Sequence, residues 1–204
     1  MESRQYIPQA EAARRLGVSN ETFLKLTGGI APLVRSNPDG RGVSLADVLR
    51  FEGMPSMTAL PADHPPILRV PKKPKLLGPS MYLEQTDHME AEGRAEREAD
   101  LRKYAKLWAA TPASSRYPHD GVNVRFTGFW ETSQANVDQL VQHGGLVVST
   151  VAGFADQVAR VLGHVTTIAY RNRKVLAVAP LSDAEATPYI VNYGPARQTP
   201  DFYA

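Results

Sequence analysis

The chain has 204 residues, which is enough for one medium-sized domain or two small ones. Its formal net charge of +2 is nearly balanced, so a nucleic-acid-binding surface would have to come from local charge placement. The absence of cysteine excludes disulfides, thiolate nucleophiles and cysteine-ligated metal sites. Neither a signal peptide nor an apolar run of membrane-spanning length is evident, so we expect a soluble cytoplasmic protein with no membrane partner.

Residues 1–53 are predicted to form a compact, mostly helical unit. Pro8 suits the first turn of a helix, and Ala10, Ala13 and Leu16 would form its buried face. Small alanines allow a second helix to approach closely. The first helix is therefore expected to pack tightly against a neighbour.

A chain reversal and a second helix are predicted next. Gly17 stands where a helix must end, a position that favours the left-handed backbone. Ser19 can cap the following helix, and Phe23, Leu24 and Leu26 would supply core contacts. This order of small, apolar, glycine and serine residues is typical of a helix-turn-helix.

A wing and a closing helix follow in the sequence. The Asn-Pro-Asp-Gly run at residues 37–40 is a strong turn signal between two short extended pieces. Ser44 would cap another helix, with Asp47 three residues later where a capping box has Glu or Gln.

This arrangement resembles the winged helix-turn-helix of the MerR and phage-excisionase group, over about a quarter of the chain. The resemblance implies that the second helix enters the major groove of double-stranded DNA while the wing touches the backbone or minor groove. By position, the implied DNA-binding residues are Arg14, Arg15, Asn20, Thr22, Lys25, Arg35 and Arg41. Asn reads adenine edges, and Lys and Arg neutralise phosphate or read guanine. Glu21 also faces the groove by position, but it repels phosphate unless it accepts a hydrogen bond from cytosine.

Residues 54–80 are predicted to form an extended, proline-rich basic linker. Proline fixes φ and cannot donate a backbone hydrogen bond, and seven prolines fall in this stretch. It also carries Arg69, Lys72, Lys73 and Lys75. The linker is either a solvated spacer or a basic arm along phosphates or a protein partner.

The remaining chain favours a charged helix followed by a small α/β sandwich, which makes the whole an α+β protein. Residues 81–110 read as the charged helix, with a short apolar stripe near its C-terminal end. Residues 120–181 suggest the order β-α-β-α-β-β, with helices over 133–143 and 154–162 and strands over 122–127, 146–151, 165–170 and 174–179. The tail, residues 182–204, would be an arm that packs on a neighbour or remains loose.

A fainter resemblance concerns the C-terminal domain. The strand ending in Thr127-Gly128, and the helix ending at Gly144-Gly145, resemble the opening of a BRCT domain. In that family these glycines shape a phosphate- or partner-binding edge. The alternative is that Gly144-Gly145 is simply a helix stop.

No enzymatic motif is evident, so we expect a protein that is not an enzyme and has no cofactor. The five histidines are scattered without metal-ligand spacing, and no P-loop, dinucleotide or nucleophile-elbow motif occurs. The first hypothesis is a DNA-binding adaptor or regulator, encoded by a phage or mobile element, whose C-terminal domain oligomerises or recruits a partner. The alternative is a structural component of a phage particle, with the helix-turn-helix and the extended arms making protein contacts.

Overall fold

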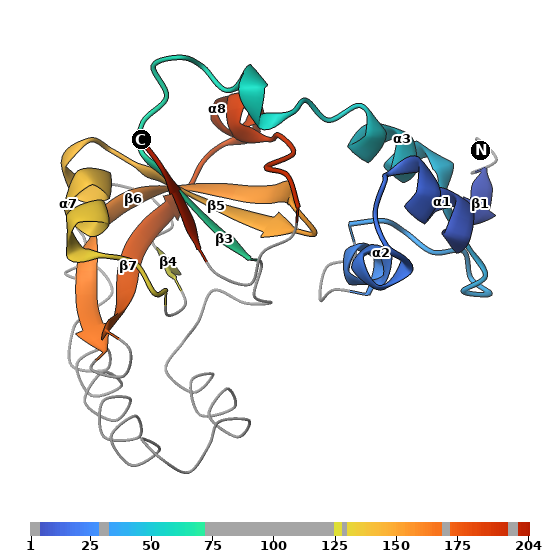
Figure 1. The fold of residues 1–204 in the computed structure, drawn as a ribbon, viewed down its shortest axis with the longest axis horizontal. Coiled ribbons are helices and arrows are strands. Elements are labelled where there is room, and N and C mark those ends of the chain that lie inside the picture. Colours follow the sequence, from blue (N-terminus) through green and yellow to red (C-terminus); the bar gives the residue numbers. More distant parts are fainter. Residues whose placement is uncertain (1–4, 29–32, 72–124, 128–129, 169–171, 196–199) are drawn as a thin grey trace, which may run out of the picture.

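The computed structural model describes residues 5–28, 33–71, 125–127, 130–168, 172–195 and 200–204 (Figure 1). We name residues 5–53 the N-terminal unit. The described residues among 67–71 and 125–204 form the sheet unit. A short connecting segment joins them and contains the 3-10 helix η1 (Met57–Ala59).

The N-terminal unit contains three helices and one small sheet. The helices are α1 (Gln9–Arg15), α2 (Asn20–Thr27) and α3 (Leu45–Glu52). Strand β1 (Tyr6–Pro8) pairs antiparallel with β2 (Gly42–Ser44), so the start of the unit is tied to the residues before α3. The apolar side chains of all these elements meet in one core: Ile7, Ala12, Ala13, Phe23, Leu26, Val34, Val43, Val48 and Phe51.

The sheet unit is built on one mixed sheet of six strands in the order β4-β7-β6-β5-β3-β8. The strands are β3 (Ile67–Pro71), β4 (Arg125–Phe126), β5 (Leu146–Val151), β6 (Phe154–Ile168), β7 (Arg173–Pro180) and β8 (Asp201–Tyr203). Only β3 and β5 pair in parallel, and every other neighbouring pair is antiparallel. The expected α+β class with a mixed sheet is therefore confirmed.

Two apolar clusters line the sheet. Helix α7 (Gln134–Gln142) packs Val137 and Leu140 against one of them. Helix α8 (Asp183–Ala186), the 3-10 helix η3 (Thr187–Tyr189) and the segment after it contribute to the other. Consecutive residues of β3, Ile67 and Leu68, belong to different clusters, so the two clusters lie on opposite faces of the sheet.

Helix α7 agrees with the prediction made for residues 133–143. Ser133 accepts a hydrogen bond from the Asn136 amide at 3.1 Å and so caps the helix start. At the other end Gly144 has a φ of +61°, the left-handed conformation that stops a helix. The strands expected over 146–151 and 174–179 are also present, as β5 and β7.

The helix predicted over residues 154–162 is wrong, because this segment is the first part of the long strand β6. The pairing of β6 with β5 shifts register between Ala155 and Gln157, which interrupts the two-residue alternation of the strand. Phe154 is buried in the core of the N-terminal unit, and Val158 and Val161 are buried in the clusters on opposite faces of the sheet. Their spacings of four and three therefore imitate a helix, although the segment is extended.

The interpretation of residues 54–80 as a linker is wrong for Ile67–Pro71. These residues form β3, which lies inside the sheet between β5 and β8. Proline is absent between Pro66 and Pro71, and the run Ile-Leu-Arg-Val has strand-forming side chains. Arg69 is not a solvated basic contact, since only 2% of it is exposed. Lys72, Lys73 and Lys75 lie outside the described residues.

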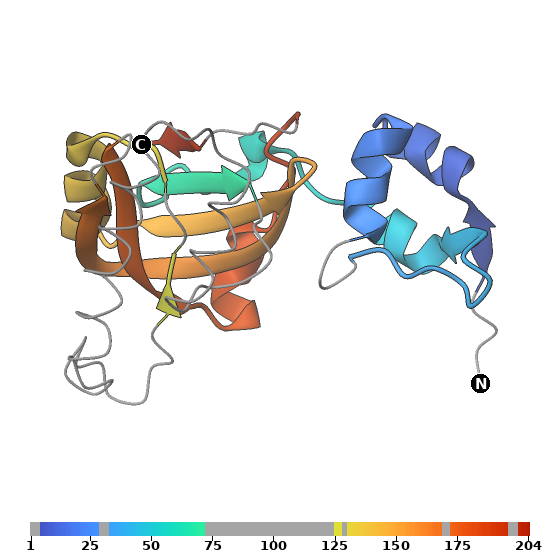
Figure 2. The same ribbon diagram turned by 90° about the horizontal axis from the view of Figure 1, so that it is seen from below.

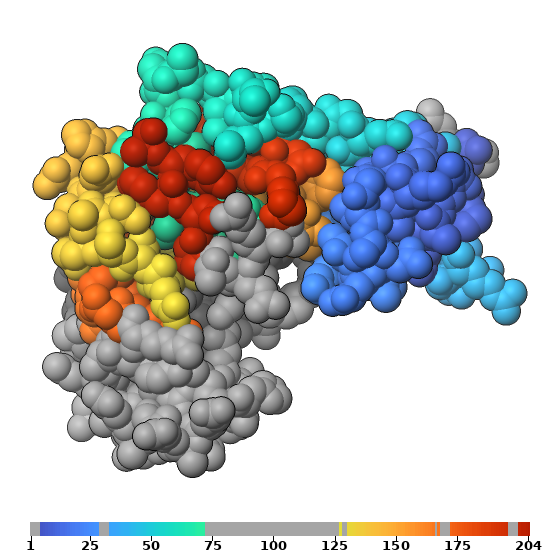
Figure 3. All heavy atoms as spheres, viewed as in Figure 1, coloured from blue at the N-terminus to red at the C-terminus, as the bar shows by residue number. Residues whose placement is uncertain are grey.

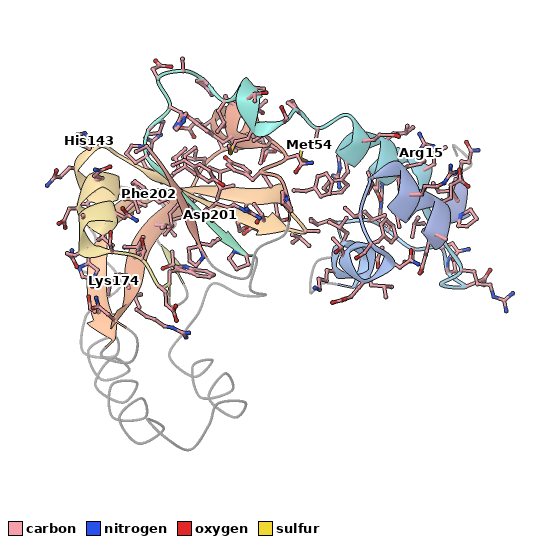
Figure 4. All side chains as sticks on the ribbon, viewed as in Figure 1. Arg15, Met54, His143, Lys174, Asp201 and Phe202 are labelled. Carbon is pink, nitrogen blue, oxygen red and sulfur yellow. The ribbon has the colours of Figure 1, made fainter. Side chains whose placement is uncertain are left out.

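The tail also differs from the expected arm. Ser182 and Glu185 form a capping box that starts α8, and β8 pairs antiparallel with β3 of the same chain. Asp201 and Phe202 are labelled within the sheet unit in Figure 4. The tail therefore completes its own sheet. The charged helix predicted over 81–110 lies outside the described residues, as does residue 128 of the BRCT-like pattern.

Candidate nucleic-acid interface

The turn between α1 and α2 forms as the sequence predicts. Gly17 has a φ of +63°, which L side chains rarely adopt. The Val18 amide then donates to the Ala13 carbonyl at 3.1 Å, which closes the turn against α1. Ser19 accepts a hydrogen bond from the Thr22 amide at 3.1 Å, so it caps α2 as expected.

Helix α2 has a sharp division between a buried and an exposed face. Phe23 and Leu26 are buried in the core of the N-terminal unit. Asn20, Glu21 and Lys25 are exposed. The face implied to enter a DNA groove is therefore not covered by the rest of the described chain.

The charge on that face is largely balanced. Lys25 Nζ lies 3.1 Å from Glu21 Oε1, one helical turn away. Both side chains are more than half exposed, so the pair is weak and solvent-screened. The ion pair nevertheless leaves α2 without a net positive charge, and Asn20 is the exposed neutral polar residue beside it.

The wing is a tight turn whose tip presents Arg41. Asn37 Oδ1 accepts from the Arg41 amide at 2.8 Å, and the Gly40 amide donates to the Asn37 carbonyl at 2.9 Å. Gln9 Nε2 reaches the Gly40 carbonyl at 3.3 Å, which ties the tip to the start of α1. The Arg41 side chain is exposed and, within the part of the chain that is described, makes no ion pair.

Arg35, expected as a wing contact, holds the N-terminal unit together. Its Nε and Nη2 each donate to a different oxygen of buried Asp47, at 2.9 Å, and its amide donates to Asp47 Oδ2 at 3.0 Å. Burial disfavours the charged carboxylate, but the hydrogen bonds and the charge of Arg35 outweigh burial and hold the pKa of Asp47 below its usual range. This fork joins the base of the wing to α3.

Arg15 is also held inside the unit, whereas Arg14 is not. Arg15 Nη2 lies 2.7 Å from Glu52 Oε2, and this pair links the end of α1 to the end of α3. Arg15 is labelled in Figure 4 on the N-terminal unit. Arg14 is exposed, and among the described residues it makes no ion pair.

The expected site residues therefore fall into two groups. Exposed on the surface are Arg14, Asn20, Lys25 and Arg41. Thr22 is half-buried, and its hydroxyl accepts from Ser19 at 2.9 Å. Arg15 and Arg35 have carboxylate partners from α3. The spacing of charges along the sequence could not show these partners, because Glu52 and Asp47 are far from them in the chain.

One feature of the exposed α2 face was not anticipated. Leu24, expected as a core residue, is 54% exposed. It lies one turn after Asn20 and next to Lys25, so it belongs to the same outward face. Leu49 of α3 is also largely outside the core, with 49% of it exposed. A strict helical count around Phe23 and Leu26 would have placed Leu24 outside.

Comparisons with family models, with curated proteins and with solved structures found no match to this chain. Within the described ranges, no helix has both the length and the apolar character needed to cross a membrane. The same ranges contain no cluster of three or more histidine or acidic side chains that could hold a metal ion.

Proposed function

We propose that the N-terminal unit binds double-stranded DNA, with α2 in the major groove and the wing on the backbone. The observation that carries this proposal is the exposed face of α2, which presents Asn20, Glu21 and Lys25 while Phe23 and Leu26 fix the helix from behind. The wing tip, which Gln9 ties to the start of α1, presents Arg41. This placement suits a groove-reading helix flanked by a phosphate contact.

Five of the exposed residues have a chemical role in this proposal. Asn20 has the amide that can read an adenine edge, and Leu24 can contact a thymine methyl group. Arg14, Lys25 and Arg41 can neutralise phosphates. Arg15 and Arg35 act through Glu52 and Asp47 by keeping the helices and wing in place.

A single module of this size buries too little surface for tight specific binding at physiological salt. Residues 5–53 hold six basic and five acidic side chains, so the electrostatic attraction of one copy is small. We therefore propose that the protein acts as a homo-oligomeric adaptor or regulator, with the sheet unit supplying the contact between copies or with a partner. A phage or mobile element, and the cytoplasm of its host, form the proposed setting.

The test is the salt dependence of binding to a fluorescent mixed-sequence duplex, measured by anisotropy on the full chain. Arg41→Ala and Arg14→Ala should each weaken binding and make the slope of log K against log salt shallower by about 1. Glu21→Gln should strengthen binding, because it removes a negative charge from the groove face. Arg173→Ala, on the sheet unit, is the matched control. No binding, or equal slopes in all variants, would contradict the proposal.

The exposed leucine of α2 favours one second candidate, a helix face that docks on protein in a phage particle or similar assembly. An apolar side chain that is 54% exposed amid balanced charge suits a protein partner as well as a base. Light scattering can follow assembly of the full chain at several salt concentrations. If α2 docks on protein, assembly should not depend on salt, and Leu24→Ser should abolish it. Under the DNA proposal, the same variant keeps most of its phosphate-driven affinity and its salt slope.

A further inference from the structure

The tip of the β5–β6 hairpin carries an aromatic side chain that belongs to the core of the other unit. Phe154 is 3% exposed and lies in the same cluster as Phe23, Val48 and Phe51. Its ring meets the Phe51 ring edge-on, with centroids 5.1 Å apart and planes at 73°. Val151 and Ala152 of the hairpin and Met54 of the connecting segment pack around this cluster.

We infer that Phe154 is a positioning residue. Through this side chain the tip of the β5–β6 hairpin packs into the core of the N-terminal unit and fixes the orientation of that unit on the sheet. The two units therefore form one rigid body. Figures 1 and 2 both show the hairpin tip directed at the N-terminal helices. In Figure 3 the hairpin atoms abut those of the N-terminal unit, and in Figure 4 Met54 lies at the junction.

The shape of the hairpin turn places Phe154. Ala152 and Gly153 have φ values of +56° and +95° between the paired residues Val151 and Phe154. Two consecutive positive φ values make a tight two-residue turn that matches strand twist. A Cβ on Gly153 would lie 1.8 Å from the Gly194 carbonyl oxygen, so only glycine fits there.

A third segment locks the hairpin to the connecting chain. The Tyr193 amide donates to the Gly153 carbonyl at 2.9 Å, which holds residues 192–194 on the turn. The Asn192 amide donates to the Pro55 carbonyl at 2.7 Å, and the Met57 amide donates to the Asn192 carbonyl at 3.0 Å. Asn192 therefore ties the connecting segment to the hairpin, and residues 54–57 cannot act as a free spacer.

This inference deepens the proposed function, because a fixed N-terminal unit would present α2 to DNA in one direction set by the sheet unit. Oligomers built through the sheet unit would then have a defined separation between their α2 helices. The rigidity itself does not depend on DNA binding, so it can be tested without any nucleic acid.

The experiment is ¹⁵N relaxation of the full chain in the absence of DNA. Amides of α2 and of β7 should report the same rotational correlation time, that of the whole chain. Phe154→Ala should shift α2 amides to a shorter correlation time than β7 amides, while Phe154→Leu should restore most of the coupling. Val141→Ala, an exposed α7 position, is the matched control and should change nothing.

Gly153→Ala disrupts the contact between the units in a second way, because it forces the hairpin turn away from Gly194 without changing Phe51 or Phe154. In this variant the α2 amides should also report a shorter correlation time than the β7 amides. Different correlation times for α2 and β7 in the unmodified chain would overturn the inference. Coupling unchanged in folded Gly153→Ala and Phe154→Ala proteins would overturn it too. Failure of DNA binding in the anisotropy assay would leave this result intact.

Discussion

The N-terminal unit and the sheet unit differ in how far along the chain their contacts reach. In the N-terminal unit, α1 packs on α2 directly after a short turn. The capping residues Ser19 of α2 and Ser44 of α3 each accept a hydrogen bond from an amide three residues later. In the sheet unit, β3 pairs Ile67 with Leu146 on one side and with Tyr203 on the other. The turn and the helix caps of the first unit are therefore specified by local chemistry, whereas the sheet depends on partners that lie far away in the sequence.

The largest expected effect comes from breaking a buried ion pair between residues that lie far apart in the sequence. Arg69 is buried and bonds Asp201 at 2.8 Å, the Pro195 carbonyl at 3.0 Å and Thr150 Oγ1 at 3.3 Å. Arg69→Met removes the charge that compensates Asp201, so we expect a loss of about 3–5 kcal/mol in the free energy of unfolding. Urea denaturation followed by tryptophan fluorescence measures it, since Trp130 is buried in the sheet unit.

The matched control is the exposed ion pair of the N-terminal unit. Arg15→Met breaks the contact with Glu52, whose side chain is 37% exposed. A surface pair contributes only about 0–1 kcal/mol, so the midpoint should hardly move. An equal loss of unfolding free energy in Arg69→Met and Arg15→Met would show that burial of an ion pair does not determine how much the pair stabilises the fold.

A smaller effect is expected at the local turn. A Cβ on Gly17 would meet no atom within 4 Å, so Gly17→Ala costs only the strain of its φ of +63°. That strain is about 1–2 kcal/mol. Gly17→Asn should recover part of the loss, because asparagine tolerates this conformation better. Thermal unfolding by circular dichroism distinguishes the two, and an alanine variant as stable as the parent would contradict the turn assignment.

The smallest effect is a pH dependence of the N-terminal unit. Because Arg35 holds the pKa of folded Asp47 below its unfolded value, the carboxylate stabilises the fold above the unfolded pKa of about 4. This stabilisation is lost as the pH falls through the lower, folded pKa. Unfolding midpoints measured from neutral to acid pH should therefore fall less in Asp47→Asn than in the parent chain. Parallel pH profiles would argue against a stabilising Arg35–Asp47 fork.

The sequence predicted the locally specified parts well. Gly17, Ser19 and Ser44 mark turns and caps through their own backbone preferences, and the structure places all three as expected. The same holds for α7, which Ser133 begins and Gly144 ends. The α2 face was predicted to be outward, and Asn20 and Lys25 are exposed.

Features that depend on distant partners could not be predicted in the same way. The run 67–71 looks like a linker until β5 and β8 are placed beside it. Arg35 looks like a DNA contact until Asp47 is seen beneath it. Phe154 fits a helix pattern in the sequence, whereas its burial comes from the core of another unit. In each case a contact across the fold decides the role of the residue.

The inner position of β3 has a consequence for how the protein is synthesised. β3 leaves the ribosome soon after the N-terminal unit, but its neighbours in the sheet are β5 and β8, which are translated much later. Until then its backbone N–H and C=O groups have no strand partner and its apolar side chains have no sheet to pack on, and such unpaired strands promote aggregation of nascent chains. The helices of the N-terminal unit can form as they emerge, while β3 must wait for most of the polypeptide before both of its strand partners exist.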